Sequence, residues 1–254
     1  MAAYVPFSWE MARDCGFVST RGEYIRILRD LCMLRAEEVL AQVAARPEQE
    51  LIQMVHMRDQ LDEVINHLSE KALEWHAARS PGFSRKYRAL RGSRVAIVLG
   101  GSGNVHIRNV GAGIEHLAAI RRDLNRDIEK AARALLPNCT ALVGGIVAAR
   151  LLSEAGGLVP LSRLPAGTIQ VLGARTALFF HLTSGTPPPK HGIIYQHRRV
   201  HRASRERRGR VARVLAAKLA IAARIDLYRG APDEKFLALA QAAVERAGGL
   251  HDMD

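Results

Sequence analysis

The part of the chain that decides its fold reads GARTALFFHL (173–182), PPPKHGIIYQH (187–197) and RRGRVARVLAAKLAIAARID (207–226). The last run predicts a helix from about Arg205 to Leu227, because its apolar residues recur at helical spacing: Val211, Leu215, Leu219 and Ile221 or Ala222. The three prolines at 187–189 exclude a helix there. These runs therefore predict a helical domain in which the last long helix carries a basic face.

The positive charge of the chain is concentrated in this domain. Between Pro137 and Gly230 there are 15 Lys and Arg residues and 3 Asp and Glu residues, a surplus equal to the formal charge of +12 on the whole chain. A field of one sign attracts polyanions and does not by itself stabilise a fold. Arginines crowd residues 198–210 above all, which makes nucleic acid the expected partner.

Composition points to a mainly α protein. Hydrophobic residues make up 48% of the chain and aromatic residues only 5%, so its apolar content is mostly aliphatic. Such residues favour packed helices over a β-sandwich. No run of about 18 uncharged apolar residues occurs, so no membrane partner is expected. The three cysteines form neither a disulfide framework nor a CxxC pair, which fits a reducing cytoplasm.

Two apolar series upstream predict a helical hairpin. One contains Leu51, Val55, Leu61, Ile65, Leu68, Ala72 and Trp75, and the other contains Ile114, Leu117, Ile120, Leu124, Ile128, Ala131 and Leu135. Their connection includes the breaker at 80–82, a basic run at 85–88 and a β-like run at 95–99, and residues 1–20 show no clear period. We predict an N-terminal helical remnant (1–46), a coiled-coil hairpin (47–136), a basic RNA-binding domain (137–230) and a C-terminal helix and tail (231–254).

The sequence gives little support for catalysis. The glycine run after Val95 lacks the third glycine of a dinucleotide fingerprint, and no GxxxxGK[ST] loop is present. His181, His191, His197 and His201 lie close in sequence, but the arginines beside them would repel a metal ion. We therefore predict no catalytic residue, no metal ligand, no cofactor and no enzyme activity.

Five runs of the basic domain are similar to one known family. They are LPNCTALVG (136–144), LPAGTIQVLGA (164–174), ALF (177–179), PPKHGIIYQ (188–196) and RGRVARVLAAKLAIAARID (208–226). LEWHAARSPGF (73–83) adds a weaker match. Together they resemble the Nop domain of box C/D ribonucleoprotein core proteins from archaea and eukaryotes. The resemblance implies a coiled-coil hairpin followed by a compact, all-helical Nop domain.

The resemblance also implies partners and a set of site residues. Such proteins bind a kink-turn RNA together with a small ribosomal-protein-like partner, dimerise through the coiled coil and position the methyltransferase fibrillarin for 2'-O-methylation of rRNA or tRNA. An archaeal member would act in the cytoplasm. The positions that would face RNA, completed by two more arginines of the last basic run, are Gly173, Ala174, Arg175, Thr176, Lys190, His191, Gln196, His197, Arg208, Arg210 and Arg213.

The chain departs from the family pattern in ways that leave an alternative open. Arg175 and Thr176 stand where the family has GluLys, and Phe180 stands where it has arginine. Only residues 1–46 precede the hairpin, where the family places an α/β domain for fibrillarin. The first hypothesis is a kink-turn ribonucleoprotein subunit, and the alternative is a general basic RNA-binding module that does not recruit fibrillarin.

Overall fold

The computed structural model describes residues 8–79 and 93–249. Every regular element in these two ranges is a helix, which confirms the mainly α prediction. None of the described helices is long and apolar enough to cross a membrane. Residues 1–49 form one unit and residues 50–254 form a second, and each is considered by itself. The breaker at 80–82 and the basic run at 85–88 lie outside the described residues.

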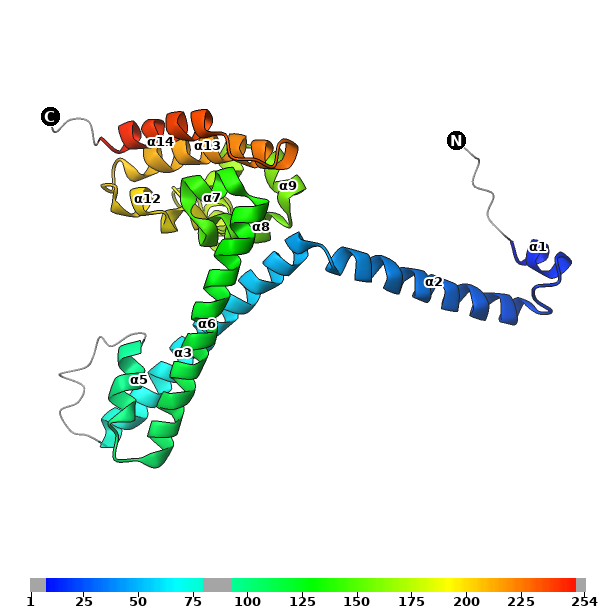
Figure 1. Ribbon diagram of the computed structural model, residues 1–254, viewed down its shortest axis with the longest axis horizontal. Helices are drawn as coiled ribbons and strands as arrows, with labels where there is room; N and C mark the ends of the chain where they lie inside the picture. Colours follow the sequence, from blue (N-terminus) through cyan, green and yellow to red (C-terminus); the bar gives the residue numbers. More distant parts are fainter. Residues whose placement is uncertain (1–7, 80–92, 250–254) are drawn as a thin grey trace. The chain divides into compact units, whose positions relative to one another are not determined.

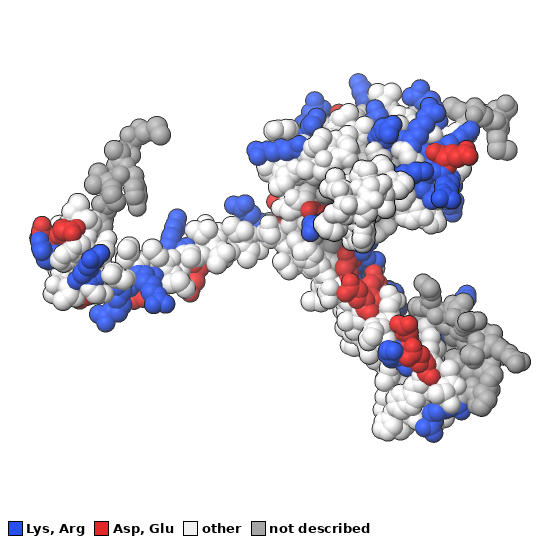
Figure 2. Space-filling view, turned by 180° about the vertical axis from the view of Figure 1, so that it is seen from behind, with Lys and Arg blue, Asp and Glu red and all other residues white. Residues whose placement is uncertain are grey.

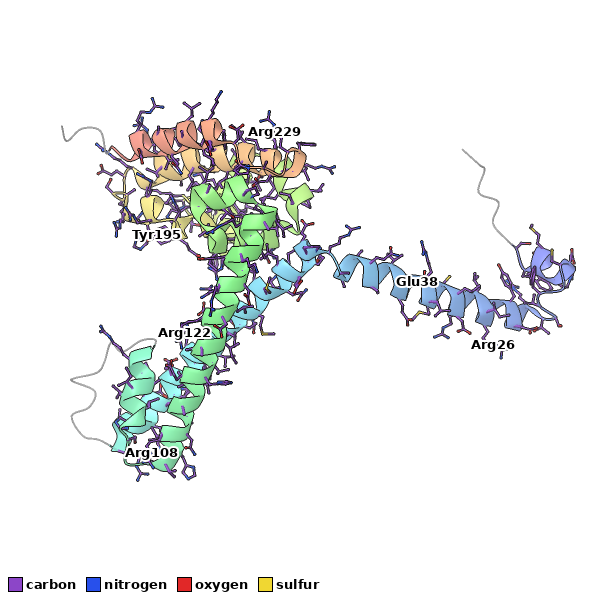
Figure 3. The ribbon with its side chains drawn as sticks, in the orientation of Figure 1. Arg26, Glu38, Arg108, Arg122, Tyr195 and Arg229 are labelled. Carbon is purple, nitrogen blue, oxygen red and sulfur yellow. The ribbon has the colours of Figure 1, made fainter. Side chains whose placement is uncertain are left out.

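The first unit contains two helices with capped N-termini. α1 (Trp9–Asp14) begins after Ser8, whose Oγ accepts a hydrogen bond from the Met11 N–H, so a short helix forms although the sequence shows no clear period up to residue 20. α2 (Arg21–Ala44) begins after Thr20, whose Oγ1 accepts from the Glu23 N–H. Arg26 and Glu38 project from α2 (Figure 3). None of the residues of α2 is buried, although the helix is rich in leucine and isoleucine.

The hairpin consists of α3 (Pro47–Arg79) and α6 (Val105–Leu135), which lie side by side (Figure 1). α3 carries two stripes at heptad spacing. One faces the interior and contains Leu51, Val55, Ile65, Ser69 and Ala72, all buried. The second is exposed and contains Met57 (58%), Val64 (44%), Leu68 (38%) and Trp75 (43%). Leu68 and Trp75 therefore belong to a different face from Leu51 and Val55, which the sequence prediction had placed in the same seam.

The predicted β-like run at 95–99 is helical in the structure, as part of α5 (Ser93–Gly100). Val95 and Leu99, four residues apart, are buried against Ile107 and Ile114 of α6. A Cβ on Gly111 would lie 2.9 Å from the Leu99 Cβ, so the glycine allows α5 and α6 to approach closely. Tertiary burial at helical spacing outweighs the weak strand preference of the valines and isoleucine in this run.

An ion-pair network joins the base of the hairpin to the domain that follows. Arg58 contacts Asp59 at 2.8 Å and Asp62 at 3.0 Å within α3. Arg121 of α6 contacts Asp62 at 2.7 Å, and Arg150 of α8 (Gly145–Ala155) contacts Asp59. Because three helices contribute to the network, it orients the hairpin relative to α8.

The basic domain packs around one long helix. It contains α7 (Pro137–Val143), α8, α9 (Leu158–Arg163), α10 (Ala166–Val171), α11 (Arg175–Ser184), the 3-10 helix η1 (Ile193–Gln196), α12 (Arg198–Arg202), α13 (Arg208–Tyr228) and α14 (Glu234–Gly248). α13 contacts α7, α9, α10 and α14. Its buried face includes Val211, Leu215, Leu219 and Ala222, whereas Ile221 is 41% exposed. Alanines elsewhere on α13 let four helices approach it closely.

A buried carboxylate on α13 completes the N-terminus of α7. Asp226 is 3% exposed, and its Oδ1 accepts hydrogen bonds from the backbone N–H and the Nδ2 of Asn138, both at 2.8 Å. Its Oδ2 accepts from the Cys139 N–H at 3.0 Å. The first N–H groups of a helix have no partner within the helix, so Asp226 acts as an N-cap supplied by a distant element.

Candidate nucleic-acid interface

Backbone hydrogen bonds hold two of the predicted RNA-facing segments together. The Gly192 N–H donates to Gln170 O and the Ile193 N–H donates to Leu172 O, both at 2.8 Å. Gln170 also donates from Nε2 to Lys190 O at 2.8 Å. The segment 190–193 is therefore fixed beside the segment 170–174, which leads into α11.

Two glycines make this close pairing possible. Gly173 has φ +81°, and a Cβ on it would lie 2.5 Å from Ile193 Cγ1. A Cβ on Gly192 would lie 1.9 Å from Leu172 O. A side chain at position 192 would therefore clash with the Leu172 backbone, and one at position 173 would clash with the Ile193 side chain in a backbone conformation that favours glycine. The glycines thus position Lys190 and His191 relative to the start of α11.

Tyr195 is the centre of an aromatic and cationic cluster. Its ring stacks on His191, with centroids 4.4 Å apart and planes at 18°, and the His201 ring centroid lies at 5.2 Å. The Arg208 guanidinium lies over the Tyr195 ring, 5.3 Å from its centroid. A Cβ on Gly209 would lie 3.8 Å from Lys190 Cδ, so the Lys190 stem lies against the first turn of α13. Lys190, His191, Tyr195 and Arg208 are thus brought together from the loop, η1 and α13.

His191 and His197 have lowered pKa values. Burial lowers the pKa of His191, and the Arg208 and Lys190 charges beside it act in the same direction. Burial also lowers the pKa of His197, assisted by Arg199 and Arg198. A lowered pKa favours the uncharged form of both imidazoles, and the lysines and arginines supply the permanent positive charge of the interface.

Gln196 and His197 are adjacent in sequence but line separate cavities. Gln196 borders a cavity of about 380 Å³ together with Gly173, Gly192 and Tyr195. His197 borders a cavity of about 260 Å³ together with Arg199 and Leu142. His191 and His201 both pack on Tyr195. Within the described residues, no three His, Cys, Asp or Glu side chains are grouped as a metal ion would need.

The remaining predicted residues lie at the starts of two helices. Ala174 is the N-cap of α11, Arg175 and Thr176 are exposed in its first turn, and Arg175 Nε pairs with Glu154 Oε1 at 2.7 Å. α13 begins at Arg208, three residues later than predicted, because residues 205–207 form a turn. Arg208 donates from Nη2 to His201 O at 3.3 Å and Ala203 O at 3.2 Å, so it also braces the preceding turn. Neither helix has a side-chain N-cap. At α13 the Arg208 N–H already donates to Ser204 O at 2.9 Å, so the start of α11 is the better site for an anion.

α11 adds an apolar surface to the interface. None of its residues is buried, and Phe179 (63%), Phe180 (53%) and Leu182 (75%) are the most exposed of its large apolar side chains. The two phenylalanine rings pack edge to face with centroids 6.2 Å apart. An exposed apolar patch of this kind marks an interaction surface.

Charge is distributed unevenly over the second unit. Figure 2 shows Lys and Arg scattered over the domain formed by α7–α14, whereas Asp and Glu line the hairpin on the face drawn. Arg210 and Arg213 are exposed on α13. Contact between RNA and the residues placed above stays a prediction.

Comparisons with known proteins agree with this architecture. The Nop family, described as a snoRNA binding domain, fibrillarin, matches residues 101–247. An uncharacterized NOP5 family protein from Methanocaldococcus jannaschii is 31% identical over 254 aligned positions, covering 86% of this chain and 61% of the relative. Nucleolar protein 58 of Scheffersomyces stipitis is 45% identical over 121 residues, covering 48% of this chain and 24% of the relative. The chain therefore spans less than two thirds of the length of either relative.

A solved structure is similar over nearly the whole chain. It is a chain from the crystal structure of a fibrillarin/Nop5p complex, with a TM-score of 0.58 and 31% sequence identity, and the match covers 97% of this chain and 87% of that one. The family match runs through α6, α7–α13 and most of α14. It spans more than half of the 254 residues. The chain belongs to the Nop family.

Proposed function

We propose that this protein is a scaffold subunit of a box C/D-type ribonucleoprotein, in which it binds a kink-turn RNA together with a small kink-turn-binding protein and supports guided 2'-O-methylation. The observation that carries the proposal is the fixed pairing of segments 170–174 and 190–193, which presents Lys190 and His191 beside the uncapped start of α11. Membership of a family described as snoRNA-binding supports it. In this proposal the chain binds and positions and performs no chemistry itself.

A composite surface for RNA and protein is supported by two neighbouring features of different character. Lys190, Arg210 and Arg213 offer cations for phosphates, and backbone contacts of this kind depend on RNA shape more than on sequence. α11 offers Phe179 and Phe180, which suit an apolar patch on a protein. We propose that the RNA backbone occupies the first surface and the small partner covers the second.

A gel-shift titration tests this function. The full chain is titrated against a kink-turn RNA and a duplex of matched length, with and without the small kink-turn-binding protein, at two salt concentrations. We expect tight binding only to the kinked RNA with the small protein present. Lys190→Ala with Arg210→Ala should weaken binding and lower the salt slope by about two. Equal, steeply salt-dependent binding to both RNAs would support the alternative of a general basic RNA-binding module.

We also propose fibrillarin as a partner. The chain covers 87% of a Nop5p chain solved in complex with fibrillarin, so that relative has few residues beyond those matched here. In the first unit, α2 exposes Leu31 (59%) and Leu34 (59%) and offers an uncovered apolar surface for such a partner. Purified chain should retain fibrillarin in a pull-down, and a Leu31→Glu/Leu34→Glu variant should retain less. Absence of capture by the wild-type chain would favour the general RNA-binding module.

We further propose that the chain forms a homodimer through the hairpin, in the cytoplasm of an archaeon. The exposed stripe of Met57, Val64, Leu68 and Trp75 follows the spacing of seven and four residues that a second helix requires. Sedimentation at micromolar concentration tests the dimer, and a monomer would contradict it.

A further inference from the structure

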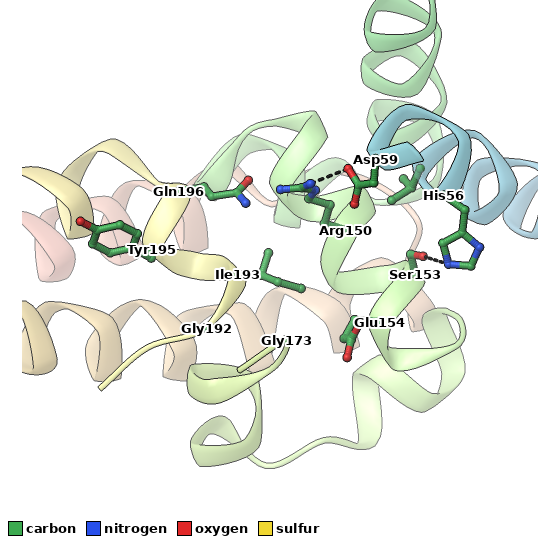
Figure 4. A pocket seen from close by; sticks show the side chains of 11 residues that line it. His56, Asp59, Arg150, Ser153, Glu154, Gly173, Gly192, Ile193, Tyr195 and Gln196 are labelled. Carbon is green, nitrogen blue, oxygen red and sulfur yellow. Dashed lines mark hydrogen bonds and ion pairs between the residues drawn. The ribbon is translucent and has the colours of Figure 1, made fainter. Parts of the chain in front are cut away.

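A cavity lies where the base of the hairpin meets α8 and the segment that contains η1 (Figure 4). Its volume of about 380 Å³ is within the range of small-molecule sites. Asp59 comes from α3, Arg150 from α8, and Gly173, Gly192 and Gln196 from the paired segments beside Lys190. The cavity therefore opens next to the loops that carry the proposed RNA interface.

One hydrogen-bond donor in the cavity wall has no partner. Arg150 uses Nη2 to contact Asp59, but its Nε is buried and makes no hydrogen bond to any described residue. A buried donor without a partner is unfavourable, and native proteins contain few of them. The accessible area of Arg150 Nε is below 1 Å², so an acceptor in the cavity reaches it only when the Arg150 side chain rotates. Gln196, which is exposed on the same cavity, adds one donor group and one acceptor group.

The charges around the cavity are already paired. Arg150 contacts Asp59, and Glu154 contacts Arg175 at 2.7 Å. Ser153 and His56 hydrogen-bond to each other at 3.0 Å. A phosphate in this cavity would meet no unpaired cation and would lie close to two carboxylates. A neutral, flat group with hydrogen-bonding edges fits better, and Ile193 provides an apolar surface for it.

We propose that this cavity receives one unpaired nucleobase of the bound RNA. The edge of the base pairs with the Gln196 amide and its face packs on Ile193, and rotation of the Arg150 side chain brings its Nε to the same edge. Unstacked bases are the parts of an RNA that proteins read by hydrogen bonding to base edges. This inference rests on the proposed function, because the RNA backbone at Lys190 is what delivers the base.

An abasic scan of the kink-turn RNA tests the proposal. Each unpaired nucleotide is replaced in turn by an abasic one, and affinity is measured for the wild-type chain, for Gln196→Leu and for Gln241→Leu, a matched control on α14. For wild type and Gln241→Leu, we expect one position at which loss of the base weakens binding about tenfold, as for a base contact of about 1–3 kcal/mol. For Gln196→Leu, removal of the same base should change affinity less than twofold, because the cavity contact is already lost. Equal sensitivity of all three proteins at every position would overturn the proposal.

A second measurement separates this proposal from the function on which it rests. Adenosine, guanosine, cytidine and uridine, which carry no phosphate, are titrated into the chain without RNA while the Gln196 side-chain amide is followed by NMR. We expect at least one nucleoside at millimolar concentration to shift this signal. If the wild-type chain binds no kink-turn RNA, the proposed function fails, and the nucleoside titration alone shows whether the cavity binds a nucleobase. If RNA binds but neither the scan nor the titration responds, the cavity proposal fails and the function stands.

Discussion

Removal of the Asp226 carboxylate should destabilise the basic domain strongly. In Asp226→Ala, the backbone N–H groups of Asn138 and Cys139 lose the acceptors that now lie at 2.8 and 3.0 Å. The Asn138 Nδ2 group keeps its bond to Ala231 O at 2.8 Å. Two buried donors without partners cost about 2–6 kcal/mol together, at about 1–3 kcal/mol each. Release of a buried charge offsets part of this, so we expect the free energy of unfolding to fall by at least about 2 kcal/mol.

Two readouts test this value. Chemical unfolding followed by circular dichroism gives the free energy, and hydrogen exchange measured by mass spectrometry reports on α7. Asp226→Asn keeps one acceptor at unchanged size and should lose less stability than Asp226→Ala. The matched control Asp123→Ala removes a carboxylate that is 67% exposed and should change stability by less than about 0.5 kcal/mol. A loss below about 1 kcal/mol in Asp226→Ala, with unchanged exchange at residues 138 and 139, would refute the reasoning.

Three further predictions concern the interface, its pH dependence and the hairpin. Gly173→Ala should weaken kink-turn RNA binding at least tenfold in gel shifts, because its Cβ would lie 2.5 Å from Ile193 Cγ1, whereas Gly167→Ala, in open space, should bind as wild type does. The pKa of His197 in the folded state lies below its unfolded value of about 6.5. The neutral His197 therefore contributes fully to stability above about pH 6.5, and this contribution is lost as the pH falls through the folded-state pKa. Between pH 7.5 and 5.5, the Tm of His197→Gln should therefore change less with pH than the Tm of the wild type. An equal change of Tm with pH in the two proteins would contradict this. Leu68→Glu should shift sedimentation toward monomer, whereas Tyr228→Glu, at a side chain that is 81% exposed outside the hairpin, should not; equal behaviour of the two would exclude the exposed stripe as the dimer surface.

The hairpin shows what a pattern of apolar residues can and cannot predict. Spacing of three and four residues identified both long helices, because burial of one face imposes that period on the sequence. It could not separate the two stripes of α3, since both consist mainly of apolar residues that recur at heptad spacing. Only the position of α6 decides which stripe is buried. The run at 95–99 was ambiguous for a related reason, because a short apolar run fits a strand or a helix equally well.

The interface was predictable where residue type is dictated by local chemistry. The glycines, prolines and cations of 173–176 and 187–191 can be recognised in the sequence, because turns and phosphate contacts require those residue types. Tyr195 was missed as an organising residue, although an aromatic residue within a basic run is a typical signal of nucleic-acid binding. Asp59 and Arg150 are 91 residues apart in sequence, and no local pattern could bring them to one cavity wall.

The cap between Asp226 and α7 has a consequence for how the protein is made. The two residues that it joins, Asn138 and Asp226, are 88 positions apart. During synthesis on a ribosome, α7 emerges long before the carboxylate that completes it, and α13, which the surrounding helices need for their core, emerges after all of them except α14. At about 5–20 residues per second, the early helices wait roughly 4–18 seconds with apolar surface uncovered. The core of this domain therefore forms late in the synthesis of the chain, in one step, once α13 is available. Before that step the exposed apolar surface of the early helices is a binding site for a chaperone.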